Sequence, residues 1–274
     1  MTEPLWVLGQ AFAVLYGLVV ASFWNVAIAR LPHGQSLWPR SSCPACGTGI
    51  AAYDNVPVAS WLALRGRCRS CHTPISVAYP LTEALGGLLG LLLFRVLIPD
   101  PAQLDAAHVA AWVVYFVFFS LLVIGSYVDL RYKVLPNEVT SLAVPAGIAG
   151  VGLLQWLGFE GFPSTTVQQA VVGCAFWGLL FAGVAGLGQL WKGRPVLGWG
   201  DVKLAAMIAS FLGPLHTFVA IMWGSIIGSV VGIGVLLLLR RRDSAYWPPL
   251  AAGTVAYVLF GQPFVSTMMP MWEL

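Results

Sequence analysis

The chain has 274 residues, of which 58% are apolar and only 9% are charged. Soluble domains carry about 25% charged residues, so this composition excludes a water-soluble globular enzyme and requires a surface that faces lipid. A net charge of +3, from 14 Lys and Arg residues against 11 Asp and Glu residues, gives no indication of a nucleic-acid binder.

Apolar stretches predict about eight transmembrane helices, since one crossing needs about 20 mostly apolar residues. The first, residues 4–29, has no charge and no basic start, so we interpret it as a retained anchor rather than a cleaved signal peptide. The uncharged stretch 204–239 would form a helix of about 54 Å, too long for one crossing. We therefore divide it at Gly213-Pro214 into two helices. The remaining spans are predicted at residues 79–98, 106–128, 139–159, 161–191 and 244–272.

The basic residues predict the orientation of these helices. All Lys and Arg residues except Arg95 fall in the loops that follow the odd-numbered helices. Because such loops remain in the cytosol, both termini are predicted to be periplasmic, in a multi-pass protein of the bacterial inner (cytoplasmic) membrane. The loop residues concerned are Arg30, Arg40, Arg65, Arg67, Arg69, Arg131, Lys133, Lys192, Arg194, Lys203, Arg240, Arg241 and Arg242.

This order predicts an all-α polytopic membrane protein in three parts. Residues 1–29 form the first transmembrane helix, and residues 30–78 form a small cytosolic module. Residues 79–274 form a transmembrane domain of about seven helices.

Four cysteines in the cytosolic module have the spacing of a metal site. Two CxxC pairs separated by about 20 residues can close a tetrahedral site for structural zinc. A cytosolic loop disfavours disulfides, and a thioredoxin-like redox site would need a strand and helix that are not predicted here. His72 could replace one sulfur, and Arg67 and Arg69 could offset the charge of the thiolates. The four predicted ligands are Cys43, Cys46, Cys68 and Cys71.

Two aspartates occupy equivalent places at the cytosolic ends of predicted helices. Asp129 ends one helix and Asp201 begins another, after Gly198 and Gly200. Two carboxylates that share one proton can hydrolyse a peptide bond, one polarising the carbonyl and the other activating water. The glycines would allow close approach and an unusual turn before Asp201, and Lys203 could tune the pair or anchor a substrate. The alternative is structural, an N-cap for Asp201 and a juxtamembrane ion pair for Asp129.

Several segments resemble one family, the bacterial type IV prepilin peptidases. Gly198-Trp199-Gly200-Asp201 is similar to the GxGD signature of membrane aspartyl proteases, and the Asp129 segment VDLRYKVLPNEVT is similar to the family's first catalytic motif. Supporting segments are SFWNVAIARLP, CPAC, DNVPVASWLALRGRCRSC and YPLTEALGG. The resemblance extends from about residue 17 to 210.

The resemblance implies an enzyme with two activities. It would cleave the basic leader from type IV prepilins or type II secretion pseudopilins after a glycine, at the cytosolic face. It would then methylate the new N-terminal residue with S-adenosylmethionine. Asp129 and Asp201 would be the catalytic pair, Glu83 and Gly87 would belong to methyl transfer, and the four cysteines would hold zinc.

The sequence departs from the family pattern at Ala78, where arginine is common, and at Trp247-Pro248-Pro249, where Gly-Pro-Phe is usual. Ala78 borders the segment tied to methyl transfer, which leaves a peptidase without methyl transfer as one alternative. The other is a non-catalytic membrane scaffold or transporter with a zinc module. No glycine-rich cofactor motif follows a predicted strand, so the binding of S-adenosylmethionine rests on the resemblance alone.

Overall fold

The described part of the protein is mostly helical. This computed structural model describes residues 2–38, 40–133, 137–193, 197–239 and 246–268, in which there is no strand and only two isolated bridges, Ser42 with Gly49 and Arg67 with Pro74. The chain forms two compact units, Met1–Leu104 and Asp105–Leu274. The prediction of an all-α membrane protein is confirmed at this level.

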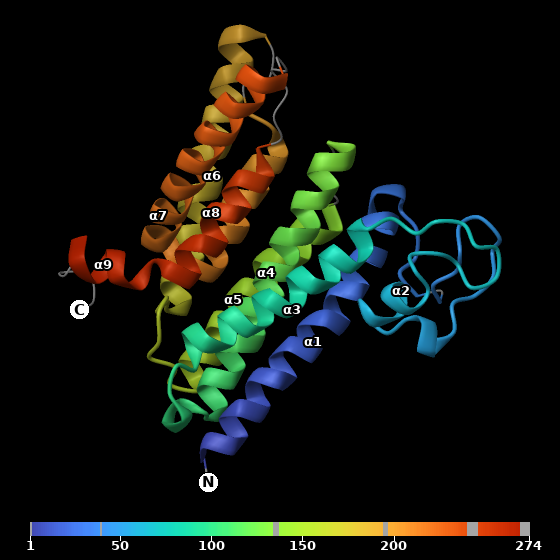
Figure 1. The fold of residues 1–274 in the computed structure, drawn as a ribbon. Coiled ribbons are helices and arrows are strands. Elements are labelled where there is room, and N and C mark those ends of the chain that lie inside the picture. The colour runs from blue at the N-terminus through green and yellow to red at the C-terminus, as the bar shows by residue number, and fades with distance from the viewer. Residues whose placement is uncertain (1, 39, 134–136, 194–196, 240–245, 269–274) are drawn as a thin grey trace. The chain divides into compact units, whose positions relative to one another are not determined.

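The first unit is a pair of long helices with a small module between them in the chain (Figure 1). Helices α1 and α3 pack along each other, and the residues that join them carry only short elements. The elements are α1 (Thr2–Arg30), η1 (Leu31–His33), η2 (Ala52–Asp54), α2 (Ala59–Ala63), α3 (Ala78–Leu97) and η3 (Pro101–Gln103).

Small residues allow the backbones of α1 and α3 to approach closely. A side chain added at Gly17 would come within 2.8 Å of the Gly86 carbonyl carbon, and one added at Gly87 within 3.1 Å of Leu18 Cγ. In membranes, such contacts let helices associate by van der Waals packing. Polar contacts fix the register, because Trp6 Nε1 donates to the Ile98 carbonyl at 2.9 Å.

The second unit is a bundle in which α7 packs against α5, α6 and α8. Two of its helices begin with conventional side-chain caps, since Asp105 accepts the His108 N–H before α4 and Thr166 forms a capping box with Gln169 before α6. The helices are α4 (Ala106–Tyr132), α5 (Asn137–Trp156), α6 (Val167–Lys192), α7 (Trp199–Leu239), α8 (Trp247–Phe260) and α9 (Gln262–Met268).

Helix α7 is broken where the sequence predicts a division. Gly213 has non-helical angles (φ 72°, ψ −178°), and Pro214 has no N–H to continue the helix. Side chains donate to carbonyls on both sides of this break. Trp177 Nε1 donates to the Pro214 carbonyl at 2.8 Å, and Thr165 Oγ1 donates to the Leu212 carbonyl at 3.0 Å. Within lipid such compensation is needed, because no water is available there.

Five helices of the described residues are long and apolar enough to cross a membrane. Many apolar side chains of α6 and α7 are exposed in the bundle, Leu187 and Leu237 among them, as lipid-facing residues would be. The predicted count of eight stays a prediction, because Leu142–Trp156 and Trp247–Phe260 are shorter apolar helices. The five candidate spans are Glu3–His33, Ala78–Leu97, Ala106–Tyr132, Val167–Trp191 and Trp199–Leu238.

Some predicted ends differ from the observed ones. Helix α6 begins at Val167 rather than near residue 161, because Pro163 and the Thr166 cap precede it. The last predicted span, residues 244–272, is divided into α8 and α9 at Gly261. Arg194, Arg240, Arg241, Arg242 and the ends of that last span lie outside the described residues.

Candidate functional site

Asp129 lies in the last turn of α4 and is half-buried. Its Oδ2 accepts a hydrogen bond from the backbone N–H of Trp247, at 3.2 Å. Trp247 is the first residue of α8, so the Asp129 carboxylate lies at the positive end of a helix dipole. The charge of Lys133, one turn further along, also acts on Asp129.

The first turn of α8 offers few backbone donors besides the Trp247 N–H. Pro248 and Pro249 have no N–H, so Trp247 carries the only backbone N–H among the first three residues of the helix. The Trp247 side chain is 1% exposed, and its Nε1 donates to the Leu122 carbonyl of α4 at 3.2 Å. Gly125 leaves room for the indole, because any side chain there would collide with it. This contact is not evident from the sequence, in which Trp247-Pro248-Pro249 is only a departure from the family pattern.

Asp201 lies in the first turn of α7 and is also half-buried. Its Oδ2 accepts the N–H of Gly198 at 3.2 Å, and its own N–H donates to the Gly198 carbonyl at 3.0 Å. Asp201 is the third residue of α7 and not its N-cap, so the structural alternative is wrong in position, but the Asp201 side chain does cap the helix start by bonding back to Gly198. This cap does not exclude chemistry, because the pairing uses only one carboxylate oxygen.

The glycines before Asp201 act by small size rather than by an unusual turn. Neither Gly198 nor Gly200 has a positive φ, so the predicted turn is wrong, and Gly200 already belongs to α7. A side chain at Gly198 would lie 3.3 Å from Asp201 Oδ2, which is tight. Close approach of the carboxylate to the backbone is therefore the reason for glycine at Gly198. Lys203 is exposed on α7.

The two carboxylates are near enough for the charge of Asp129 to act on Asp201. Each uses Oδ2 for one backbone N–H, and among the described residues neither Oδ1 has a hydrogen-bond partner or is fully buried. The structure thus places two acidic groups from α4 and α7 within electrostatic range of each other, each held by a helix start and each with one oxygen available. That arrangement can bind a water molecule or a peptide carbonyl.

The second candidate site is the cysteine cluster. The sulfurs of Cys43, Cys46, Cys68 and Cys71 all lie within 4.8 Å of one another, and Cys43 Sγ is 3.7 Å from Cys71 Sγ. A tetrahedral zinc site with Zn–S bonds of about 2.3 Å places its sulfurs about 3.8 Å apart. All four cysteines are free thiols. The donor set therefore fits a single metal ion held by sulfur.

Two matching turns form this cluster. Cys43 N–H donates to the Thr48 carbonyl and Cys68 N–H donates to the Thr73 carbonyl, both at 2.9 Å. The Thr73 hydroxyl contacts Cys71 Sγ at 3.2 Å and, with the Thr73 backbone, lowers the pKa of Cys71 to about 6. A thiol with such a pKa is a thiolate at neutral pH, which is the form that binds metal.

His72 does not belong to the cluster. It is exposed, and its φ of 57° places it where the first turn has Gly47, with φ 70°. The metal-ligand group found among the described residues contains the four cysteines alone. His72 is thus a turn residue.

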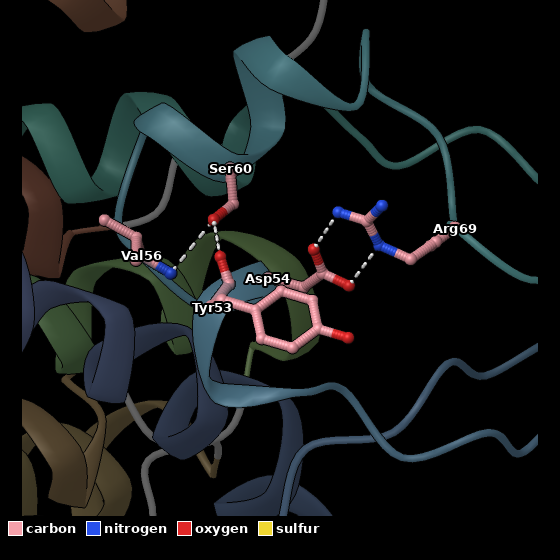
Figure 2. A network of polar contacts seen from close by, with 5 residues as sticks. All are labelled: Tyr53, Asp54, Val56, Ser60 and Arg69. Atoms are coloured by element: carbon pink, nitrogen blue, oxygen red, sulfur yellow. Dashed lines mark hydrogen bonds and ion pairs between the residues drawn. The ribbon is translucent and has the colours of Figure 1, made fainter.

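Arg69 forms an ion pair with a carboxylate and not with the thiolates (Figure 2). Its Nε and Nη2 donate to the two oxygens of Asp54 at 2.7 and 2.6 Å, and its guanidinium lies over the Tyr53 ring. The bidentate pair lowers the pKa of Asp54 and raises that of Arg69. The expectation that Arg69 offsets the thiolate charge therefore needs correction, because a planar carboxylate matches the guanidinium better than sulfur does.

Figure 2 also shows how the segment after Asp54 is fixed. Val56 N–H donates to Ser60 Oγ at 3.1 Å, and Ser60 Oγ donates to the Tyr53 carbonyl at 2.9 Å. Two residues on, Val58 N–H donates to Glu83 Oε2 of α3 at 2.7 Å. Glu83 thus ties the module to the helix.

Glu83 and Gly87, predicted to belong to methyl transfer, lie on α3 and are both buried. Glu83 is the only buried carboxylate among the described residues, and its negative charge would suit a cationic ligand. Gly87 contacts α1 and has a packing role there. Their part in methyl transfer stays a prediction.

Comparisons with known proteins identify the family of the chain. The profile of the bacterial Peptidase A24 N-terminal domain matches residues 15–97, and that of the type IV leader peptidase family matches residues 116–233. No solved structure matches the chain. A prepilin leader peptidase/N-methyltransferase of Myxococcus xanthus is 41% identical, covering 97% of this chain and 76% of its own length.

Two further relatives cover most of both chains. A prepilin leader peptidase/N-methyltransferase of Aeromonas hydrophila is 33% identical over 88% of each chain. The type 4 prepilin-like proteins leader peptide-processing enzyme of Escherichia coli is 30% identical, over 90% of this chain and 92% of its own. With relatives this similar over nearly the whole sequence, the chain belongs to the prepilin leader peptidase/N-methyltransferase family of membrane enzymes.

Proposed function

We propose that this enzyme cleaves the basic leader from type IV prepilins or type II secretion pseudopilins and then methylates the new N-terminal residue. The observation that carries the proposal is the pair of half-buried carboxylates, Asp129 and Asp201, held near each other by the starts of α8 and α7. The distribution of basic residues supports a position of this pair at the cytosolic face of the inner membrane, where a basic leader would remain.

Cleavage would proceed by general acid–base catalysis. One aspartate, protonated, donates a hydrogen bond to the carbonyl oxygen of the scissile peptide after glycine. The other, ionised, removes a proton from the attacking water. The resulting tetrahedral intermediate collapses as the amine leaves with a proton, and no covalent bond to the enzyme forms. Gly198, Gly200 and Lys203 are proposed as supporting residues of this site.

The metal would be structural zinc, because four thiolates complete a tetrahedron and leave no position for substrate. It would fix residues 43–74, and through the contact of Val58 with Glu83 it would fix the module relative to α3. We retain the proposed division of the chain into a first helix (1–29), a zinc module (30–78) and a protease domain (79–274).

S-adenosylmethionine would supply the methyl group for the new amine. Glu83 is the residue of this chain that fits such a cationic cofactor, by its charge and burial. A negative side chain there could also accept the proton that the amine loses. Gly87, one turn further along α3, would preserve the close packing that places Glu83.

One reaction tests both activities. The purified full chain in lipid nanodiscs is incubated with a prepilin and S-adenosylmethionine, and the product is read by intact mass. Loss of the leader together with one added methyl group is the expected result. Loss of the leader without the methyl group would leave a peptidase alone. No cleavage by folded, zinc-loaded protein would favour the scaffold alternative.

Substitution of a cysteine ligand should release the metal. We expect Cys43→Ser to lower zinc from one equivalent to near zero and to expose residues 40–75 to protease, because three thiolates no longer close the tetrahedron. Cys174→Ser, on α6 outside the cluster, is the control and should retain zinc. Full zinc content in Cys43→Ser would refute the site.

Substitutions of Glu83 separate the role of its negative charge from its role in accepting the Val58 N–H. Glu83→Gln retains an oxygen that can accept the Val58 N–H, whereas Glu83→Ala does not. If the negative charge serves methyl transfer, both variants should cleave a prepilin normally and leave it unmethylated. Normal methylation by Glu83→Gln would show instead that Glu83 acts only by holding Val58.

A further inference from the structure

The cysteine module carries an open, strongly basic depression. Its volume is about 610 Å³, and three of its lining residues are arginines. No carboxylate lines it, although the proposed zinc ligand Cys68 does, and only one of its three arginines is paired with a carboxylate. The lining residues are Ala63, Leu64, Arg65, Arg67, Cys68, Arg69 and His72.

Two of these arginines are not engaged by the protein. Arg69 is held by Asp54, but Arg65 and Arg67 are exposed and have no side-chain partner in the described part of the chain. Both line the same depression, so both guanidinium groups are available to one anion. Arginine presents several N–H donors in a plane, which suits the oxygens of a phosphate.

The backbone that presents them is fixed. Gly66 N–H donates to the Trp61 carbonyl at 2.8 Å, and Arg67 N–H donates to the Leu64 carbonyl at 3.2 Å. The Trp61 indole packs against Gly66, and its Nε1 donates to the Ile75 carbonyl at 3.1 Å. Both arginines therefore extend from a closed turn, which lowers the entropy lost when they bind a ligand.

The place of the depression indicates which anion is available. The module follows α1 and precedes α3, two candidate membrane spans, so its two ends meet the membrane on one side. Leu62 of α2, adjacent in the chain to the lining residue Ala63, is 62% exposed and would suit the lipid boundary. At such a surface, the phosphates of anionic lipids are the most concentrated anions, and basic residues near it are attracted to them.

We propose that this depression binds the phosphate of an anionic phospholipid headgroup through Arg65 and Arg67. The bound lipid would hold the metal module against the membrane surface. The proposal is independent of the peptidase chemistry, since none of its residues belongs to the aspartate site. The competing explanation is that the arginines neutralise the metal-bound thiolates, although no hydrogen bond joins either side chain to a described cysteine sulfur.

Hydrogen exchange of the full chain in nanodiscs tests this proposal. Nanodiscs of phosphatidylcholine are compared with nanodiscs that contain increasing fractions of phosphatidylglycerol. We expect amides of residues 62–72 to exchange more slowly as phosphatidylglycerol increases. Arg65→Gln and Arg67→Gln should each raise the fraction needed for half the effect about tenfold, the cost of one charge-assisted hydrogen bond.

Arg40→Gln is the matched control, since it removes one positive charge from the same module outside the depression. It should retain the response to phosphatidylglycerol, and zinc content should be equal in all variants. Equal responses of Arg40→Gln and Arg67→Gln would overturn the proposal. So would loss of zinc from Arg67→Gln, or the same protection produced by inorganic phosphate in phosphatidylcholine nanodiscs.

Discussion

Asp129→Asn and Asp201→Asn should each abolish leader cleavage, with a loss of about 10⁴-fold or more. Asparagine nearly preserves the shape of each side chain, and its carbonyl can still accept the N–H of Trp247 or Gly198. It cannot exchange a proton, so the remaining aspartate has no partner in the reaction. The rate of leader loss, followed by mass, is the measurement.

The double substitution distinguishes a pair from two independent groups. Residues that act as a unit are strongly non-additive, so the double variant should be about as inactive as either single one. Glu160→Gln is the control for a carboxylate that is exposed and outside the site, and it should leave the rate unchanged. Methylation of a peptide that already lacks its leader should persist in all variants. Cleavage well above background in either single variant would contradict the shared mechanism.

The arrangement of the helices follows from patterns that are local in the sequence. Gly213 followed by proline divides an apolar stretch because one residue leaves helical angles and the next lacks an N–H. The cysteine pairs predict their own turns, since each CxxC closes through backbone hydrogen bonds with a threonine shortly after it. These features need no knowledge of tertiary contacts.

The parts that could not be predicted depend on contacts between distant segments. Asp54 and Arg69 pair across the module, and only the folded turns bring them together. Asp129 and Trp247 are 118 residues apart, and the sequence holds no signal for their hydrogen bond. Two prolines after a tryptophan predict a helix start, but not which side chain the free N–H will meet.

The contact between Trp247 and Asp129 can be tested by removing its N–H. Proline is tolerated at the first position of a helix but has no N–H, so Trp247→Pro removes both the indole and the donor to Asp129. Trp247→Ala removes the indole alone and is the matched variant. Both lose the bond from Nε1 to the Leu122 carbonyl and leave a cavity of similar size. Trp247→Pro should be the less stable of the two, because a proline disfavours the αR conformation of the residue before it, Tyr246.

The difference in kcat between the two variants then measures the contribution of the N–H of residue 247 that donates to Asp129. A hydrogen bond to a charged group contributes about 1.5–3 kcal/mol, so kcat of Trp247→Pro should be about 10- to 150-fold below that of Trp247→Ala. KM should be similar in both, because the N–H orients a catalytic carboxylate rather than the leader. Thermal unfolding of both variants checks that both are folded at the assay temperature. Equal kcat values in two folded variants would mean that the start of α8 supports the bundle and does not position Asp129. A lower value for Trp247→Pro would place the start of α8, far along the chain from the Asp129 motif, in the catalytic machinery.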